Sequence, residues 1–136
     1  MKTWAMMYGI IWAAFFQILV VLFPALGASV ALGIHLVLGV IVLALAYLIY
    51  VRVRATSCPD RIKRITKATF GFAVFETFLG VALYEAQKGN SGLLTDSISF
   101  LHVAVALAII TQASSSATAF DMWEEKEFME APKTGA

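Results

Sequence analysis

Long runs of apolar residues, separated by short polar segments, extend along this chain from Trp4 to Phe120. Four of these runs are long enough for a helix that crosses the hydrocarbon core of a bilayer, which takes about 20 residues. Such a segment is expected to be helical because lipid offers the backbone no hydrogen-bond partners. The predicted spans are residues 4–23, 28–50, 65–86 and 97–120, and residues 121–136 form an acidic tail.

Short loops between the four spans predict an all-α fold, namely an integral membrane four-helix bundle of up-down-up-down topology, with residues 1–136 as a single domain. The composition agrees, since 60% of the residues are hydrophobic and 14% are charged, whereas a soluble domain is about half apolar and a quarter charged. The net charge of +1 gives no reason to expect a nucleic-acid partner. The expected surroundings are the lipid bilayer.

The first apolar run has a second interpretation. Lys2, the run itself and the small-residue stretch ALGAS resemble a signal peptide with its cleavage site. The run is long for the apolar region of such a peptide, and we therefore expect it to be the first span.

The segment between the second and third spans, RVRATSCPDRIKRITK, carries six basic residues against one acid, Asp60. Basic loops of membrane proteins stay in the cytoplasm, so we expect a multi-pass protein of the plasma membrane with this loop and both termini cytoplasmic. Anionic lipid headgroups are another partner for such a loop, but the topology signal explains it without them. Cys58, the only cysteine, is expected to be a loop thiol, and it excludes an intramolecular disulfide.

The only two histidines lie within apolar runs, in ALGIHLVLGV and SFLHVAVALA. His35 is seven residues into the second predicted span, and His102 is five residues into the fourth. At 1.5 Å of rise per residue, both lie roughly 8–10 Å below the outer edge of the membrane. These two spans are diagonal partners in an up-down bundle, about 12–14 Å apart. Both imidazoles are therefore expected to reach inward at the same level.

Two imidazoles across this gap can hold one metal ion with bonds of about 2 Å each. Heme iron, with axial positions on both faces of a flat ring, suits this arrangement, whereas tetrahedral zinc needs two further ligands. A macrocycle also needs small residues beside its ligands, and those one turn from the histidines are Ala31, Gly39, Ser99 and Ala106. Small residues are equally common where membrane helices pack, and one buried histidine often only bridges helices. Two histidines at matched depth favour a different interpretation, in which His35 and His102 are the axial ligands of a heme iron.

Glu76 falls near the middle of the third span, where a charge costs about 3 kcal/mol or more. It has two interpretations. It is either a proton-relay group or hydrogen-bond anchor below the cofactor, or a neutral acid bonded to a neighbouring helix. Gln17, at comparable depth in the first span, is the candidate partner.

Three segments, HLVLGVIVLALAYLIYVRVR, FETFLGVALY and LHVAVALAIITQA, resemble the second, third and fourth helices of one half of heme A synthase. That enzyme consists of two homologous four-helix bundles, each with a histidine pair on its second and fourth helices, and half-length archaeal members have a single bundle. The resemblance covers residues 30–115. It implies that His35 and His102 are axial ligands of heme b, with heme o or heme a as substrate or product. Glu76 stands where the family often has a glutamine.

The chain also departs from this family. The family's catalytic half has a glutamate just before its first histidine, whereas SVALGI precedes His35, and the outer loop lacks the cysteine pair of many members. The resemblance thus implies a heme-binding protein that either oxidises heme o to heme a or transfers electrons. Glu76 is the only candidate catalytic residue. It implies a terminal oxidase or heme O synthase as partner, and a bundle this small is also expected to self-associate.

Two other functions stay open from the residues. One is a small proton-coupled transporter that uses Glu76, and the other is a cofactor-free structural subunit of a membrane complex. Transporters often contain an inverted pair of short, broken helices, and the sequence gives no sign of one. An optical spectrum separates the heme protein from both.

Overall fold

The computed structural model describes residues 2–89 and 92–130, with the backbone alone at 128 and 130. Its regular structure is helical, in the order α1 (Thr3–Val21), the short 3-10 helix η1 (Pro24–Leu26), α2 (Ala28–Arg54), α3 (Asp60–Lys88) and α4 (Gly92–Glu130). The four α-helices are each long and apolar enough to cross a membrane. The predictions of an all-α fold and of four helices of spanning length are confirmed.

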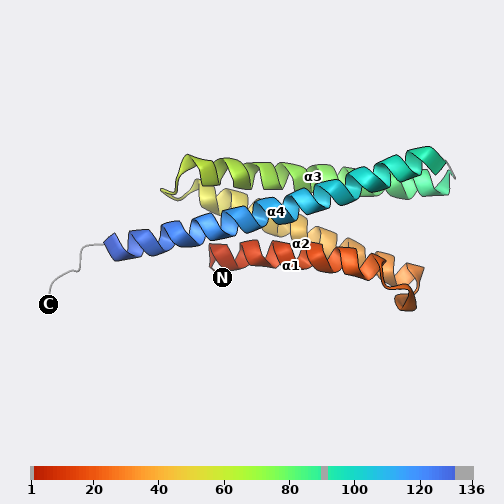
Figure 1. The fold of residues 1–136 in the computed structure, drawn as a ribbon, viewed down its shortest axis with the longest axis horizontal. Coiled ribbons are helices and arrows are strands. Elements are labelled where there is room, and N and C mark those ends of the chain that lie inside the picture. Colours follow the sequence, from red (N-terminus) through yellow and green to blue (C-terminus); the bar gives the residue numbers. More distant parts are fainter. Residues whose placement is uncertain (1, 90–91, 131–136) are drawn as a thin grey trace.

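The helices form an up-down-up-down bundle. The main contacts join α1 to α2 and α4, and α3 to α2 and α4, so α2 and α4 are diagonal (Figure 1). The start of α1, the α2–α3 connection and the end of α4 lie at one end of the bundle. We call this the basic end, because the basic residues of segment 52–67 lie there. The opposite end, with η1 and the α3–α4 connection, is called the histidine end.

Buried side chains concentrate toward the basic end. Among the described residues, none between positions 15 and 41 and none between positions 80 and 104 is buried. The buried positions elsewhere include many small residues, which let membrane helices approach closely: Ala13, Ala14, Ala46, Ala73, Ala113, Ser116 and Ala117. The pairs α1–α2 and α3–α4 therefore pack tightly at the basic end and separate toward the histidine end (Figure 1).

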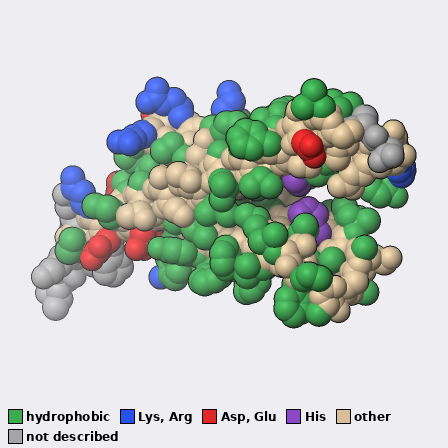
Figure 2. Space-filling model, turned by 45° about the vertical axis from the view of Figure 1, so that its right-hand side comes forward, with side chains coloured by type: hydrophobic (Ala, Val, Ile, Leu, Met, Phe, Trp, Pro, Cys, Tyr) green, Lys and Arg blue, Asp and Glu red, His purple; other side chains and the backbone are tan. Residues whose placement is uncertain are grey.

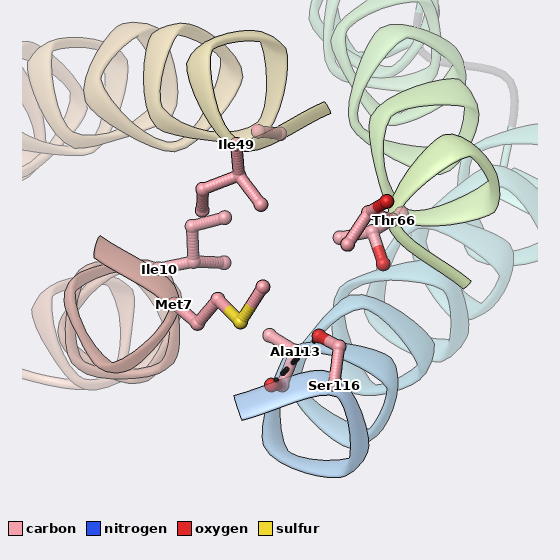
Figure 3. A pocket seen from close by; sticks show the side chains of 8 residues that line it. Met7, Ile10, Ile49, Thr66, Ala113 and Ser116 are labelled. Carbon is pink, nitrogen blue, oxygen red and sulfur yellow. Dashed lines mark hydrogen bonds between the residues drawn. The ribbon is translucent and has the colours of Figure 1, made fainter. Parts of the chain in front are cut away.

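The core at the basic end contains a layer of hydroxyl side chains. Thr66, Thr69 and Ser116 are buried, and each donates its hydroxyl to a carbonyl one turn earlier in its own helix. They line a cavity of about 10 Å³ together with apolar side chains from α1, α2 and α4 (Figure 3). A cavity of this volume holds at most one water molecule, so it is a feature of core packing and not a site for a larger ligand.

The helices extend further into polar sequence than the apolar runs. Helix α3 begins at Asp60 rather than near residue 65, and α4 continues ten residues past 120 to Glu130. The reason at α3 is a favourable start, with Pro59 before the helix and an acid in its first turn. The segment after residue 120 is rich in Glu and Met, which are good helix formers. The first part of the predicted acidic tail thus continues α4, and residues 131–136 lie outside the described part of the chain.

The outer surface of the bundle is apolar. Large side chains on every α-helix are more than half exposed, for example Trp12, Leu36, Val81 and Leu107. On the face shown in Figure 2, charged side chains gather at the ends of the molecule, while apolar side chains cover the middle. Soluble monomers rarely expose an apolar patch of this extent. The surface is typical of helices that contact lipid.

Candidate functional site

The two histidines lie close together between the separated helix pairs. The ring centroids of His35, on α2, and His102, on α4, are 6.0 Å apart, and the ring planes are inclined by 52°. Figure 2 shows the histidine side chains in the hollow between the two lobes of the histidine end. The diagonal helices therefore bring the two rings to one level of the bundle.

The His35 ring is held by α1. Its Nδ1 lies 3.3 Å from the backbone oxygen of Gln17, and Gln17 Nε2 donates to the backbone oxygen of His35 at 3.1 Å. A carbonyl oxygen can only accept, so the proton of a neutral His35 ring is on Nδ1. The lone pair is then on Nε2.

The His102 ring faces Glu76 on α3. His102 Nδ1 and Glu76 Oε1 are 3.1 Å apart, and each side chain is 16% exposed. The atoms are within ion-pair distance but out of line for a hydrogen bond, so His102 Nδ1 and Glu76 Oε2 have no hydrogen-bond partner among the described residues. The terminal torsion of a glutamate is soft, so rotation of the Glu76 carboxylate is the movement that would bring the two atoms into line. Gln17, expected beside Glu76, bonds to His35 instead.

The surroundings of the two rings have one feature in common. Each Nδ1 faces an oxygen acceptor on a neighbouring helix, and neither Nε2 bonds to any residue that the structure describes. Metal-binding histidines typically donate their second N–H to a carbonyl or carboxylate, which fixes the ring and makes the ligating nitrogen more basic. His35 has this second partner already, and the Glu76 carboxylate lies at 3.1 Å from the corresponding nitrogen of His102 without a hydrogen bond between them.

The separation of the rings also suits a shared metal ion. A metal–nitrogen bond is about 2 Å, and a five-membered ring with bonds of about 1.33 Å has its centre about 1.1 Å from each atom. Two rings bonded to one ion on opposite sides would then have centroids about 6.2 Å apart. The observed distance between the His35 and His102 centroids is 6.0 Å.

The small residues near the histidines have different surroundings. A Cβ at Gly39 would lie 3.0 Å from Gln17 Nε2, so this glycine makes room for the amide that bonds to His35. Ala31, Ser99 and Ala106 are partly buried within one turn of the two histidines. Gly80, which the sequence did not single out, packs on His102, because a Cβ there would lie 3.5 Å from its Cε1. Its position one turn after Glu76 was the available signal.

The site offers two nitrogen ligands for a metal ion, one from each histidine. Within the described ranges 2–89 and 92–130, no group of three or more His, Cys, Asp or Glu residues could hold a metal ion. A pair of imidazoles alone suits a metal whose other ligands come from its own cofactor, as in heme, better than a bare ion. His35 and His102 are therefore the described residues that could hold such a cofactor.

Cys58 is outside the site. It lies in the connection between α2 and α3, as expected for a loop thiol, but its side chain is only 2% exposed and its Sγ lies 3.8 Å from the backbone oxygen of Val53. The connection between α2 and α3 is short and folds this small apolar side chain into the core at the basic end.

Comparison of the chain with protein-family models, with curated proteins and with solved structures finds no match. The candidate function therefore follows from the geometry of the histidine pair and its two oxygen partners.

Proposed function

We propose that this chain is an integral membrane protein that binds a b-type heme through His35 and His102. One observation carries the proposal: two imidazoles on diagonal helices have ring centroids 6.0 Å apart, and each has Nδ1 turned to an oxygen acceptor. Nε2 of His35 and Nε2 of His102 would then be the atoms that hold the heme iron. The resemblance to heme A synthase supports the same assignment.

We place the basic end in the cytoplasm and the histidine end toward the outer side of the plasma membrane. The support is the charge distribution, since six basic residues lie between positions 52 and 67, and such segments are retained in the cytoplasm. The start of α1 and the end of α4 lie at that same end (Figure 1). Both termini are then cytoplasmic.

The protein's own residues position the cofactor and control its surroundings. A bound heme supplies either one-electron transfer or oxidation of a heme o methyl group, as in heme A synthase. Gln17 fixes the His35 ring, and Glu76 orients the His102 ring and can hold a proton at Oε2 close to the site. If both histidines hold the iron, the chemistry that the heme would supply is electron transfer rather than oxidation. The same proposal includes a terminal oxidase or heme O synthase as the partner protein. It also includes self-association of the chain.

The test is the heme content of the purified protein and of its histidine variants. Wild type, expressed with a heme precursor and purified in detergent, is expected to show a Soret band and the spectrum of a low-spin heme. His35→Ala and His102→Ala are each expected to lose most of the heme while the helix content stays the same. A wild-type protein without a Soret band, or a double variant with unchanged heme content, contradicts the proposal.

A second candidate function is a proton-coupled carrier. The observation that favours it is the acid–imidazole pair of Glu76 and His102 at 3.1 Å within helices of spanning length. Vesicles that contain the heme-free protein would then take up protons when a pH gradient is imposed, and Glu76→Gln would abolish the uptake. Uptake equal to that of protein-free vesicles rejects the carrier.

A further inference from the structure

A groove at the basic end forms a second candidate site, remote from the histidines. It offers about 570 Å³ between the end of α2 and the start of α3. Four basic residues and one acid converge on it, and its lining is Tyr50, Arg54, Asp60, Lys63, Arg64 and Lys67. On the face shown in Figure 2, Lys and Arg side chains gather at this end of the molecule. The groove is therefore strongly positive.

The positions on α3 show that this convergence is more than a topology signal. Residues 60, 63, 64 and 67 are spaced so that they share one face of a helix, whereas membrane topology depends only on how many basic residues a loop carries. Among the described residues, Lys63, Arg64 and Lys67 form no ion pair, and Asp60 pairs with none of them. Their charges are available to an anion from outside the chain.

An aromatic surface adjoins the cations. Arg54 Nη1 donates to the Tyr50 hydroxyl at 2.8 Å, and the guanidinium lies over the Tyr50 ring at 5.4 Å from its centroid. The Tyr50 ring stacks on Phe70 of α3, with centroids 5.6 Å apart and planes inclined by 10°. Tyr47, which is 51% exposed, also packs on Phe70 at 5.6 Å. The rings thus cover the junction of α2 and α3 directly beside the cations.

The order along the helix axis identifies the ligand class. Tyr47 precedes Arg54 by about two helical turns, or about 10 Å, toward the middle of the bundle. A ligand with an anionic head beside the cations and an apolar chain on the rings matches this order, and an acidic phospholipid has both parts. A free phosphate would use only the cations. Basic pockets between membrane helices bind acidic headgroups in this way.

We propose that this groove binds one acidic phospholipid, with its phosphate between Arg54 and the α3 residues Lys63, Arg64 and Lys67, and with an acyl chain along Tyr47 and Phe70. The proposal assumes that the chain spans a membrane, as proposed above, but it does not depend on heme. Arg61 provides a matched control. It is an exposed arginine three residues before Arg64 on the same helix, and it does not line the groove.

The experiment is native mass spectrometry of the full chain in mild detergent with equal amounts of dioleoylphosphatidylglycerol and dioleoylphosphatidylcholine. Wild type is expected to retain phosphatidylglycerol several-fold in excess of phosphatidylcholine. Arg64→Gln is expected to lower this ratio several-fold, whereas Arg61→Gln, which removes the same charge from the same segment, leaves it unchanged. Both side chains are exposed, and circular dichroism is expected to show wild-type helix content in both variants.

Three results would overturn the proposal. Equal retention of the two lipids by wild type excludes recognition of the acidic headgroup. An equal fall of the phosphatidylglycerol-to-phosphatidylcholine ratio in Arg61→Gln and Arg64→Gln shows that the preference depends only on overall charge. Displacement of phosphatidylglycerol by an equal concentration of inorganic phosphate shows that the rings contribute nothing and that the ligand is a free anion. Heme content, measured on the same samples, is expected to be the same in both variants, so this proposal and that of heme binding fail separately.

Discussion

Gln17 and His35 form a reciprocal pair that joins α1 to α2: the Gln17 amide donates to the His35 backbone oxygen, and His35 Nδ1 donates to the Gln17 backbone oxygen. The acceptor for the His35 ring is thus a backbone atom, which no side-chain substitution removes. The acceptor facing His102 is a side chain, the Glu76 carboxylate. The two proposed ligands therefore differ in their sensitivity to mutation.

We predict that Glu76→Leu weakens heme retention about 10- to 100-fold, the usual effect of removing the second partner of a metal-binding histidine. Gln17→Leu removes only the amide bond and is expected to weaken retention less than about 10-fold. Glu76→Gln keeps an oxygen acceptor and is expected to stay close to wild type. The measurement is the rate of heme transfer to excess apomyoglobin. A larger effect for Gln17→Leu than for Glu76→Leu would contradict this assignment.

We predict that Gly39→Ala disturbs the site and that Gly80→Ala does not. The new methyl group at position 39 would lie 3.0 Å from Gln17 Nε2, so the amide must move and its bond to His35 weakens. At position 80 the nearest atom, His102 Cε1, is at 3.5 Å, which is ordinary contact. Gly39→Ala is expected to speed heme loss several-fold, and Gly80→Ala to leave it unchanged. The same result for both variants would show that these glycines do not differ in the way their contacts indicate.

The uneven packing predicts a difference between two isoleucines. Ile10, 1% exposed at the basic end, packs in the core, whereas Ile34 at the histidine end is 37% exposed. Ile10→Ala is expected to lower the free energy of unfolding by about 2–5 kcal/mol, and Ile34→Ala by about 0.5 kcal/mol or less. Reversible unfolding of the detergent-solubilised chain measures both. Equal losses would mean that the two ends are equally packed.

The proposed orientation can be tested with single cysteines. In a Cys58→Ala background, Gln87→Cys is expected to react with an impermeant maleimide in intact cells, whereas Ser57→Cys reacts only after permeabilisation. Both positions are exposed and lie at opposite ends of the bundle. Cys58 itself is expected to react slowly on either side, because its side chain is buried. Labelling of Ser57→Cys in intact cells would show that the orientation is the opposite of the proposed one.

The helices and the meeting of the histidines could be predicted from sequence because both depend on distance along the chain. The length of each apolar run predicts one long helix, and similar positions along two diagonal helices bring His35 and His102 together. The start of α3 at Asp60 and the end of α4 at Glu130 were not predicted. Charged residues mark the end of an apolar run, but a helix can continue through them.

The partners of the histidines could not be predicted because they depend on rotation about each helix axis. A helix that is apolar on all faces gives no amphipathic pattern to indicate which face turns inward. Gln17 was therefore placed beside Glu76, although it bonds to His35, and Glu76 lies against His102. Gly39 was correctly placed near the site, but its contact is with the Gln17 amide.

The separation of the two helix pairs at the histidine end has a consequence for biogenesis. Among the described residues, the buried side chains lie mainly at the basic end, so the packing of the four helices there does not depend on a ligand at the histidine end. With the proposed function, a large flat molecule would enter sideways from the lipid after the polypeptide is in place. Its departure would leave a folded receptor that can be reloaded, rather than an unfolded chain bound for degradation.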